Sequence, residues 1–183
     1  DGRSVELLFS VSDTGVGIPG EDLGGVYSGV DFLADVALGK PVIMGQRVAV
    51  IGGGNVAMDA ARTGVRLGAK EMSIIYRRSR EEMPASHEEI EGAMAEGITF
   101  HFLTAPVKVL SDNGKVQQLE IMRMKLGEPD ASGRRRPIPV KGSEATVPVD
   151  MVITAIGQVP DLAPLMADKA AVDIPVTRWT TLA

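Results

Sequence analysis

The sequence of 183 residues contains no cysteine, only 2 histidines and few aromatic residues, at 4% of the chain. Without cysteine, these residues cannot form a disulfide framework, a thiolate zinc site, an iron–sulfur cluster or a cysteine nucleophile. His87 and His101 are too few for a histidine-rich metal site, so we expect no bound metal. The shortage of aromatic side chains predicts an aliphatic core.

Excess positive charge and long apolar runs are also missing. The formal net charge of −5 argues against a nucleic-acid partner that is bound through bulk charge. No apolar run approaches the ~20 residues that span a bilayer, so we expect no membrane partner and a cytoplasmic location. The length suits one domain of ~100–200 residues, and the missing initiator Met suggests a fragment or a processed product.

Alternating strand and helix patterns begin near residue 45. A nearly all-apolar strand is typical of a central parallel strand, and a 3.6-residue apolar stripe indicates a helix. Helix stop and start signals mark the later boundaries. The expected order is strand Arg47–Ile51, helix Asn55–Leu67, strand Glu71–Tyr76, a helix from the Ser86 capping box through Glu96, and strand Ile98–Leu103. This βαβαβ order predicts the α/β class with a Rossmann-like parallel sheet.

A different pattern follows, with turn signals between strand-like runs. The runs are Val107–Leu110, Val116–Met124 and Thr146–Val149, and they predict an antiparallel β-meander inserted at about 105–150. The basic triplet Arg134–Arg136 is interpreted as a solvated hairpin tip. We expect three parts in the chain: an N-terminal segment and crossover at 1–40, a nucleotide-binding domain at 41–157, and a return segment at 158–183.

The glycine-rich turn after the first of these strands carries the most chemistry. Gly52, Gly53, Gly54, Asn55, Val56 and Ala57 fit the pattern G-x-G-x-x-A between a strand and a helix. Gly52 allows the tight turn, Gly54 lets a pyrophosphate approach the backbone, and Ala57 lets the helix lie close to the strand. The phosphates would then meet the helix N-terminus. The alternative is a glycine turn made for packing in a protein that binds no nucleotide.

The residues at the end of the second strand determine whether such a site prefers NAD or NADP. An acidic residue there would bind the ribose 2′-hydroxyl of NAD, but this chain has Tyr76–Arg80, with Arg77 lying 23 positions after Gly54. Arginine forks match a phosphate with charge-assisted hydrogen bonds. We therefore expect NADP(H), with Arg77 and Arg78 at the 2′-phosphate and Arg80 as a weaker candidate. The alternative is a solvated basic loop that Glu81 and Glu82 partly neutralise.

Three stretches in order, Val50–Asp59, Ile74–Ala85 and Ala155–Gln158, resemble the NADPH-binding domain of the glutamate synthase small subunit family. The resemblance covers about residues 17–162. It implies an FAD-containing reductase that takes hydride from NADPH, with an FAD domain as neighbour and a large subunit that carries iron–sulfur clusters.

The resemblance also implies roles for the linkers. Residues 17–33 and 155–160 would connect the NADPH domain to the FAD domain, and Ala155, Ile156 and Gly157 would lie near the flavin–nicotinamide junction. The family's FAD motifs are missing from these residues, so we expect the chain to bind NADPH without holding FAD tightly. No catalytic side chain is expected, since hydride transfer needs positioning against the flavin.

A second resemblance lies at the N-terminus, where Asp13–Gly17 is similar to the glycine box of sensor histidine kinases. The Asn-rich helix and the second glycine box of that family are not found in the sequence. Two other functions therefore stay open beside the reductase domain: a regulatory nucleotide-binding module without turnover, and an ATP-binding kinase fragment.

Overall fold

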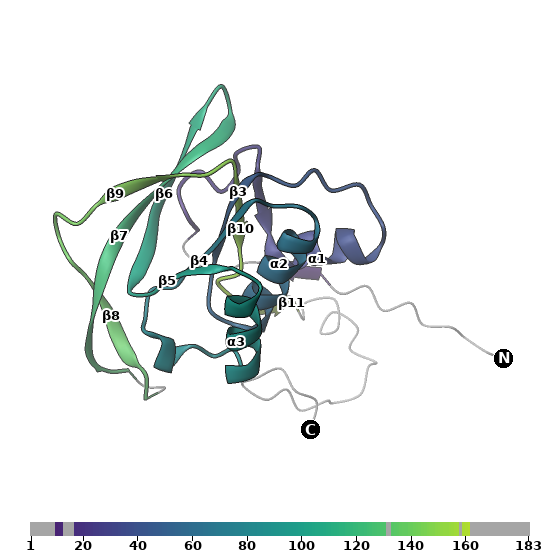
Figure 1. Ribbon diagram of the computed structural model, residues 1–183. Coiled ribbons are helices and arrows are strands. Elements are labelled where there is room, and N and C mark those ends of the chain that lie inside the picture. Colours follow the sequence, from purple (N-terminus) through teal and green to yellow (C-terminus); the bar gives the residue numbers. More distant parts are fainter. Residues whose placement is uncertain (1–9, 13–16, 131–132, 158, 162–183) are drawn as a thin grey trace, which may run out of the picture. The chain divides into compact units, whose positions relative to one another are not determined.

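The computed structural model describes residues 10–12, 17–130, 133–157 and 159–161 (Figure 1). The chain divides into two units. One comprises Gly17–Ile156, and the other comprises Asp1–Val16 with Gly157–Ala183. In the second unit, strand β1 (Ser10–Ser12) pairs antiparallel with β11 (Val159–Asp161). All the helices and strands described below belong to the first unit.

A five-stranded parallel sheet forms the centre of the first unit, in the order β2-β10-β3-β4-β5. Its strands are β2 (Val26–Ser28), β3 (Arg47–Ile51), β4 (Glu71–Ile75), β5 (Thr99–His101) and β10 (Met151–Thr154). The helices are α1 (Gly29–Ala37), α2 (Asn55–Arg66) and α3 (His87–Ala95), with a 3₁₀ turn η1 (Arg80–Glu82). The predicted βαβαβ unit is confirmed as β3-α2-β4-α3-β5, and β10 lies between β2 and β3.

The predicted antiparallel insertion is confirmed, and it is larger than expected. It consists of β6 (Thr104–Asp112), β7 (Lys115–Pro129), β8 (Arg135–Pro139) and β9 (Ala145–Pro148). Strand β7 pairs with β6, β8 and β9. Asn113 and Gly114 close the β6–β7 hairpin with φ of 52° and 77°, as a two-residue turn requires.

The basic triplet lies at the β7–β8 turn and the start of β8 with all three arginines exposed, which confirms the predicted solvated hairpin tip. Arg135 begins β8, and its guanidinium donates hydrogen bonds to the carbonyl oxygens of Leu126 and Gly127 at 3.1 and 3.2 Å. Those carbonyls belong to the second half of β7, beyond the predicted end at Met124. Glycine and proline are depleted in strands, so Gly127 and Pro129 hid this extension from propensity reasoning.

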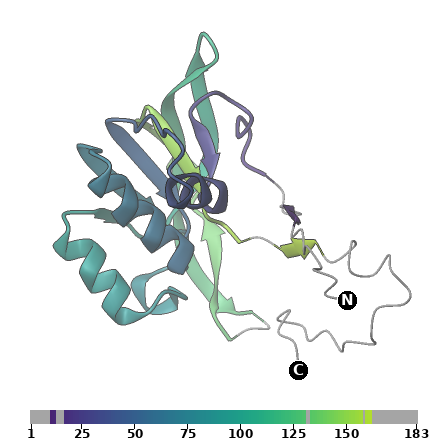
Figure 2. The ribbon, with the colours of Figure 1, turned by 90° about the vertical axis from the view of Figure 1, so that its right-hand side faces the viewer.

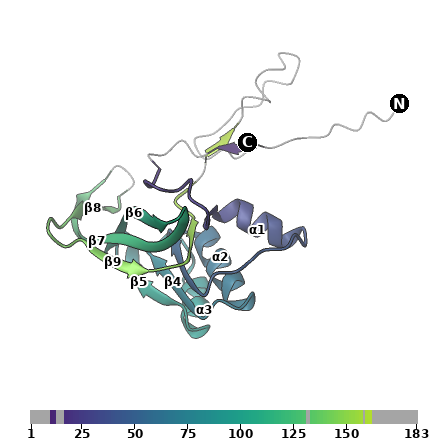
Figure 3. The same cartoon turned by 90° about the horizontal axis from the view of Figure 1, so that it is seen from above.

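The parallel sheet is covered on both faces, which explains the all-apolar sequence of β3. Val48 and Val50 pack into one core cluster with residues of the helices, whereas Ala49 and Ile51 pack into a second cluster with the antiparallel strands. All four side chains are at most 2% exposed. Figure 2 and Figure 3 show the same three layers, with helices on one side of the parallel strands and β6–β9 on the other.

An ion network joins α2 to α3. The Arg62 guanidinium contacts the carboxylates of Glu89 and Glu96, each at 2.8 Å, and Arg66 contacts Glu96 at 3.2 Å. The hydrogen bond from Arg62 holds the pKa of Glu96 below its ordinary value. Folding is therefore favoured by ionised Glu96 above the unfolded-state pKa of about 4.3, and this contribution disappears as the pH falls through the lower folded-state pKa.

The Glu96→Gln variant is accordingly expected to be less stable than the parent chain at pH 7, with the difference shrinking as the pH falls below about 4. Urea unfolding at several pH values measures this. Glu144→Gln, which changes an exposed turn residue, is the control and should show no such pH-dependent difference. A stability difference for Glu96→Gln that stays constant between pH 7 and pH 3 would contradict the ionic role.

Candidate dinucleotide site

The carboxyl ends of the parallel strands meet at one edge of the sheet. Gly52 follows β3, Ala155 follows β10, Gly29 follows β2 and Tyr76 follows β4. Ligands of open α/β sheets bind in the crevice outside this edge. The sequence-predicted residues Gly52–Ala57 and Ala155 are thus brought together by the sheet pairing.

Gly52 is required by a close approach between two loops. Its φ is 148°, and a Cβ atom built at this position would lie 2.3 Å from the carbonyl oxygen of Ala155. The two loops are joined directly, since the Ala155 N–H donates to the carbonyl of Ile51 at 2.7 Å. Only glycine fits a positive φ that leaves so little room.

No contact among the described residues requires a glycine at position 54. An added Cβ would meet only Pro84, at 3.9 Å, and the φ of Gly54 is −93°. Gly54 is the N-cap of α2 and provides no side-chain cap, so the first-turn N–H groups of Asn55 and Val56 stay available. An open backbone beside the positive end of a helix, called the cradle below, suits a phosphate group.

Tyr76 supports the glycine loop from beneath, a role that the sequence analysis missed. A Cβ on Gly53 would lie 2.5 Å from the Tyr76 ring, so the ring packs directly against this glycine. The Tyr76 hydroxyl donates to the carbonyl of Glu82 at 2.7 Å, and the N–H of Ala85 donates to the carbonyl of Gly53 at 3.1 Å. The loop that follows β4 is therefore attached to the glycine loop. The sequence feature that could have indicated this role is an aromatic residue at the end of a predicted strand.

The three arginines that we expected at the 2′-phosphate differ in their surroundings. Arg77 is exposed and forms no ion pair with a described residue. Arg80 pairs with Glu91 of α3, and the hydrogen bond from Arg80 holds the pKa of Glu91 below its ordinary value. The Arg80 guanidinium is thus already bound to a carboxylate of α3.

Arg78 has partners other than those expected. Its side chain is 6% exposed; it pairs with Asp130 at 2.7 Å and donates to the carbonyl of Arg135 at 2.8 Å. A guanidinium with buried, occupied donors cannot present a fork to a phosphate at the surface without leaving these partners. Arg78 is therefore buried and bonded while Arg77 is exposed, and the role of each at a 2′-phosphate stays a prediction.

The acidic neighbours Glu81 and Glu82 both accept hydrogen bonds from Ser79. Glu82 accepts from the Ser79 N–H at 3.1 Å and completes a capping box at η1. Glu81 accepts from the Ser79 hydroxyl, and this hydrogen bond lowers the pKa of Glu81. Among the described ion pairs, none joins Glu81 or Glu82 to Arg77.

The remaining site candidates follow β10. Ala155 is half-buried beside Gly52, and Ile156 is 44% exposed at the end of the first unit. Gly157 has φ of 100° and belongs to the second unit. Gln158 and the kinase-like residues 13–16 lie outside the described residues.

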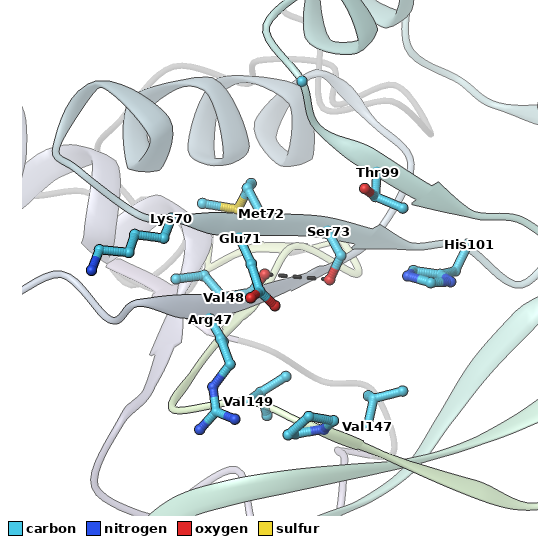
Figure 4. A pocket seen from close by; sticks show the side chains of 12 residues that line it. Arg47, Val48, Lys70, Glu71, Met72, Ser73, Thr99, His101, Val147 and Val149 are labelled. Carbon is cyan, nitrogen blue, oxygen red and sulfur yellow. Dashed lines mark hydrogen bonds between the residues drawn. The ribbon is translucent and has the colours of Figure 1, made fainter.

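A cavity of about 310 Å³ lies elsewhere in the first unit (Figure 4). Its walls come from the amino ends of β3 and β4, from β5 and from β9, and include Arg47, Lys70, Glu71 and His101. The amino ends lie at the sheet edge opposite to the glycine loop, so this cavity is not the dinucleotide crevice. Within the described ranges, no group of His, Asp and Glu side chains could hold a metal, and no helix is long and apolar enough to cross a bilayer.

Residues 11–180 match the family described as pyridine nucleotide-disulphide oxidoreductase. The chain belongs to this family. It is 50% identical over 171 residues to the NADPH-Fe(3+) oxidoreductase subunit beta of Geobacter sulfurreducens, covering 91% of this chain and 25% of that protein. It is 43% identical over 153 residues to the glutamate synthase (NADPH) small chain of Escherichia coli, covering 77% and 32%. The predicted resemblance to glutamate synthase small subunits is confirmed.

The chain thus spans about a quarter to a third of the length of these curated relatives. Solved structures of the same fold include FprA of Mycobacterium tuberculosis in complex with NADPH, with a TM-score of 0.66 and 22% identity over 80% of this chain and 48% of that one. Thioredoxin reductase of Lactococcus lactis matches with a TM-score of 0.61 and 22% identity over 89% and 47%. At this identity the likeness establishes the fold, which is the Rossmann-like fold that the sequence predicts.

Proposed function

We propose that this chain is the NADPH-binding domain of a flavin-dependent oxidoreductase of the glutamate synthase small subunit type. The observation that carries the proposal is the cradle at the carboxyl edge of the sheet, where Gly54 leaves the backbone open beside the N-terminus of α2. The exposed Arg77 lies in the loop that Tyr76 attaches to this cradle. Glycine space for a pyrophosphate and a cation for a 2′-phosphate are the two recognition elements that NADPH needs.

Each residue then has a binding role rather than a chemical one. Gly52–Gly54 and the N–H groups of Asn55 and Val56 hold the pyrophosphate, with Ala57 keeping α2 close to β3. Arg77 holds the 2′-phosphate, with a lesser contribution from Arg80. Ala155, Ile156 and Gly157 lie toward the nicotinamide. Bound NADPH supplies a hydride to a flavin, and the protein has to orient the nicotinamide and exclude water.

The rest of the enzyme is proposed from the relatives. Both curated relatives described above bear the names of NADPH enzymes, and one is named as a beta subunit, which supports assembly with other chains. We propose that FAD is held by an adjoining domain, reached through residues 1–40 and 158–183, and that a larger subunit carries iron–sulfur clusters. The separation of the chain at residues 16 and 156 supports such a division. The cytoplasmic location stays a prediction.

Gly54→Ala tests the cradle, because an added Cβ there meets only Pro84, at 3.9 Å. The added methyl group meets no backbone atom of the protein, so only the weaker N-cap preference of alanine should lower stability, by less than about 1 kcal/mol. A pyrophosphate that approaches the backbone would meet this methyl group, so NADPH affinity should fall by about tenfold or more. Calorimetric titration with NADPH measures the loss, and urea unfolding measures the stability.

Gly68→Ala is the control for nucleotide affinity, since an added Cβ there meets nothing within 4 Å and the residue lies after the far end of α2; its φ of 101° means that alanine should cost about 1 kcal/mol of stability. It should leave the NADPH affinity unchanged. Unchanged NADPH binding by Gly54→Ala would contradict the cradle, and ATP binding by the parent chain without NADPH binding would favour the kinase alternative.

A further inference from the structure

We propose that Arg78 and Asp130 form a positioning pair through which the antiparallel sheet sets the preference for NADPH over NADH. In this arrangement Arg78 is not a ligand of the 2′-phosphate. It fixes the loop that presents Arg77 to that phosphate. The inference rests on the proposed NADPH-binding function. It assigns to Arg78 the positioning role on which the specificity of Arg77 for the 2′-phosphate depends.

The pair joins two elements that are far apart in the sequence. The Arg78 Nη2 donates to Asp130 Oδ2 at 2.7 Å, and the Arg78 Nε donates to the carbonyl of Arg135, the first residue of β8, at 2.8 Å. The Arg78 side chain is 6% exposed and that of Asp130 is 24% exposed. The guanidinium is therefore largely enclosed where the end of β7 and the start of β8 meet the loop after β4. Figure 1 shows the backbone of that end of the hairpin.

Asp130 is itself held in place by the hairpin. Its N–H donates to the carbonyl of Arg134 at 2.7 Å, and its carbonyl accepts from the N–H of Gly133 at 2.9 Å. The carboxylate is therefore presented by a hydrogen-bonded turn rather than by a free chain. A buried arginine held by a carboxylate and a backbone carbonyl is a well-defined anchor, because the planar guanidinium fixes direction as well as distance.

The anchor acts on Arg77 through the backbone on either side of it. The carbonyl of Tyr76 accepts from the N–H of Thr104 at 3.0 Å, and the carbonyl of Arg78 accepts from the N–H of Leu103 at 3.0 Å. Tyr76 and Arg78 are 6% and 5% exposed, whereas Arg77 between them is exposed. The outward direction of Arg77 thus follows from two buried neighbours in the same loop, one packed beneath the glycine loop and one bonded to the end of the β7–β8 hairpin. A ligand group that is ordered before binding loses less conformational entropy when it binds.

The opposite possibility, that Arg78 leaves its pocket and binds the phosphate, predicts an effect of opposite sign. In that case Asp130 competes with the phosphate for the guanidinium, and removing its charge should tighten NADPH binding. If Arg78 is a positioning residue, removing the charge loosens the loop and weakens NADPH binding, although one negative charge near the phosphate has been lost. By Coulomb's law alone, loss of a negative charge near the phosphate would tighten NADPH binding, so weaker binding cannot be a purely electrostatic effect.

Asp130→Asn therefore tests the inference, by calorimetric titration of the full chain with NADPH and with NADH. We expect the NADPH dissociation constant to rise by about tenfold, by analogy with the tenfold or greater losses that follow changes to residues supporting metal ligands. The NADH dissociation constant should change by less than about twofold, since NADH has no 2′-phosphate and binds only the glycine cradle. NADH binding also reports that the variant is folded. Unchanged or tighter NADPH binding would overturn the inference.

Arg78→Lys provides a second test that keeps the charge. Lysine cannot bond Asp130 and the Arg135 carbonyl with one planar fork, so a positioning role predicts an NADPH loss as large as that of Asp130→Asn. A direct phosphate role predicts that lysine largely preserves binding, because an ammonium group also binds phosphate. Retained NADPH affinity in Arg78→Lys would therefore overturn the inference as well.

Asp112→Asn removes the same charge from the exposed β6–β7 hairpin and should change neither affinity. The parent chain separates the two hypotheses. If it does not prefer NADPH to NADH, the proposed function itself fails. If it does prefer NADPH and Asp130→Asn keeps that preference, only the positioning pair fails.

Discussion

Replacing Gly52 by alanine is expected to lower the free energy of unfolding by about 3 kcal/mol and to remove nucleotide binding. The added Cβ would lie 2.3 Å from the Ala155 carbonyl oxygen, and this neighbour is backbone that cannot rotate away. Overpacking of this kind costs about 1–3 kcal/mol, and a positive φ adds about 1 kcal/mol for any residue other than glycine. The glycine loop and the loop after β10 would move apart, so the site would lose its shape together with its stability.

Gly97→Ala separates the two causes. Gly97 has φ of 85°, and an added Cβ there meets nothing within 4 Å, so only the backbone conformation is disfavoured. This variant should lose about 1 kcal/mol and keep its nucleotide affinity. Urea unfolding of the two variants and the parent chain gives the comparison. Equal destabilisation of Gly52→Ala and Gly97→Ala would contradict the close packing of the two loops.

Arg77→Ala is expected to weaken NADPH binding by about tenfold to a hundredfold. A hydrogen bond to a charged group contributes about 1.5–3 kcal/mol, which corresponds to this range. Arg77 is exposed and forms no ion pair with a described residue, so its removal should leave the stability within about 0.5 kcal/mol of the parent value. NADH affinity should change little, because the interaction lost is specific to the 2′-phosphate.

Lys141→Ala removes a positive charge from an exposed turn and controls for the change in net charge. Its NADPH affinity should stay within about twofold of the parent value, and the difference between the two variants should diminish at high salt. Equal losses of NADPH and NADH affinity in Arg77→Ala would show that Arg77 acts on something other than the 2′-phosphate.

The sequence predicted those parts of the fold whose cause is local. The bounds of β3 agree with the structure, and α2 and β4 each end one residue earlier than expected. Apolar periodicity and the flanking glycines determine these elements. The position of β10 between β2 and β3 depends on pairing between residues more than 100 positions apart, as in Met151 opposite Val48. No local pattern specifies that order.

The candidate site divides in the same way. The glycine fingerprint was recognisable because its glycines stand at a characteristic spacing between a strand and a helix. The different surroundings of Arg77 and Arg78 were not recognisable, because two adjacent arginines have the same local propensity. Only the distant β7–β8 hairpin, which brings Asp130 and the Arg135 carbonyl to one of them, makes that one buried.

The most direct test of the account is the ratio of the NADPH and NADH dissociation constants of the unmodified chain, measured by calorimetry at one ionic strength. A glycine cradle with an exposed Arg77 beside it predicts that NADPH binds at least about tenfold more tightly, since the two ligands differ only in the phosphate that Arg77 would meet. Equal affinities, or a preference for NADH, would contradict the central claim that this sheet edge is built for NADPH.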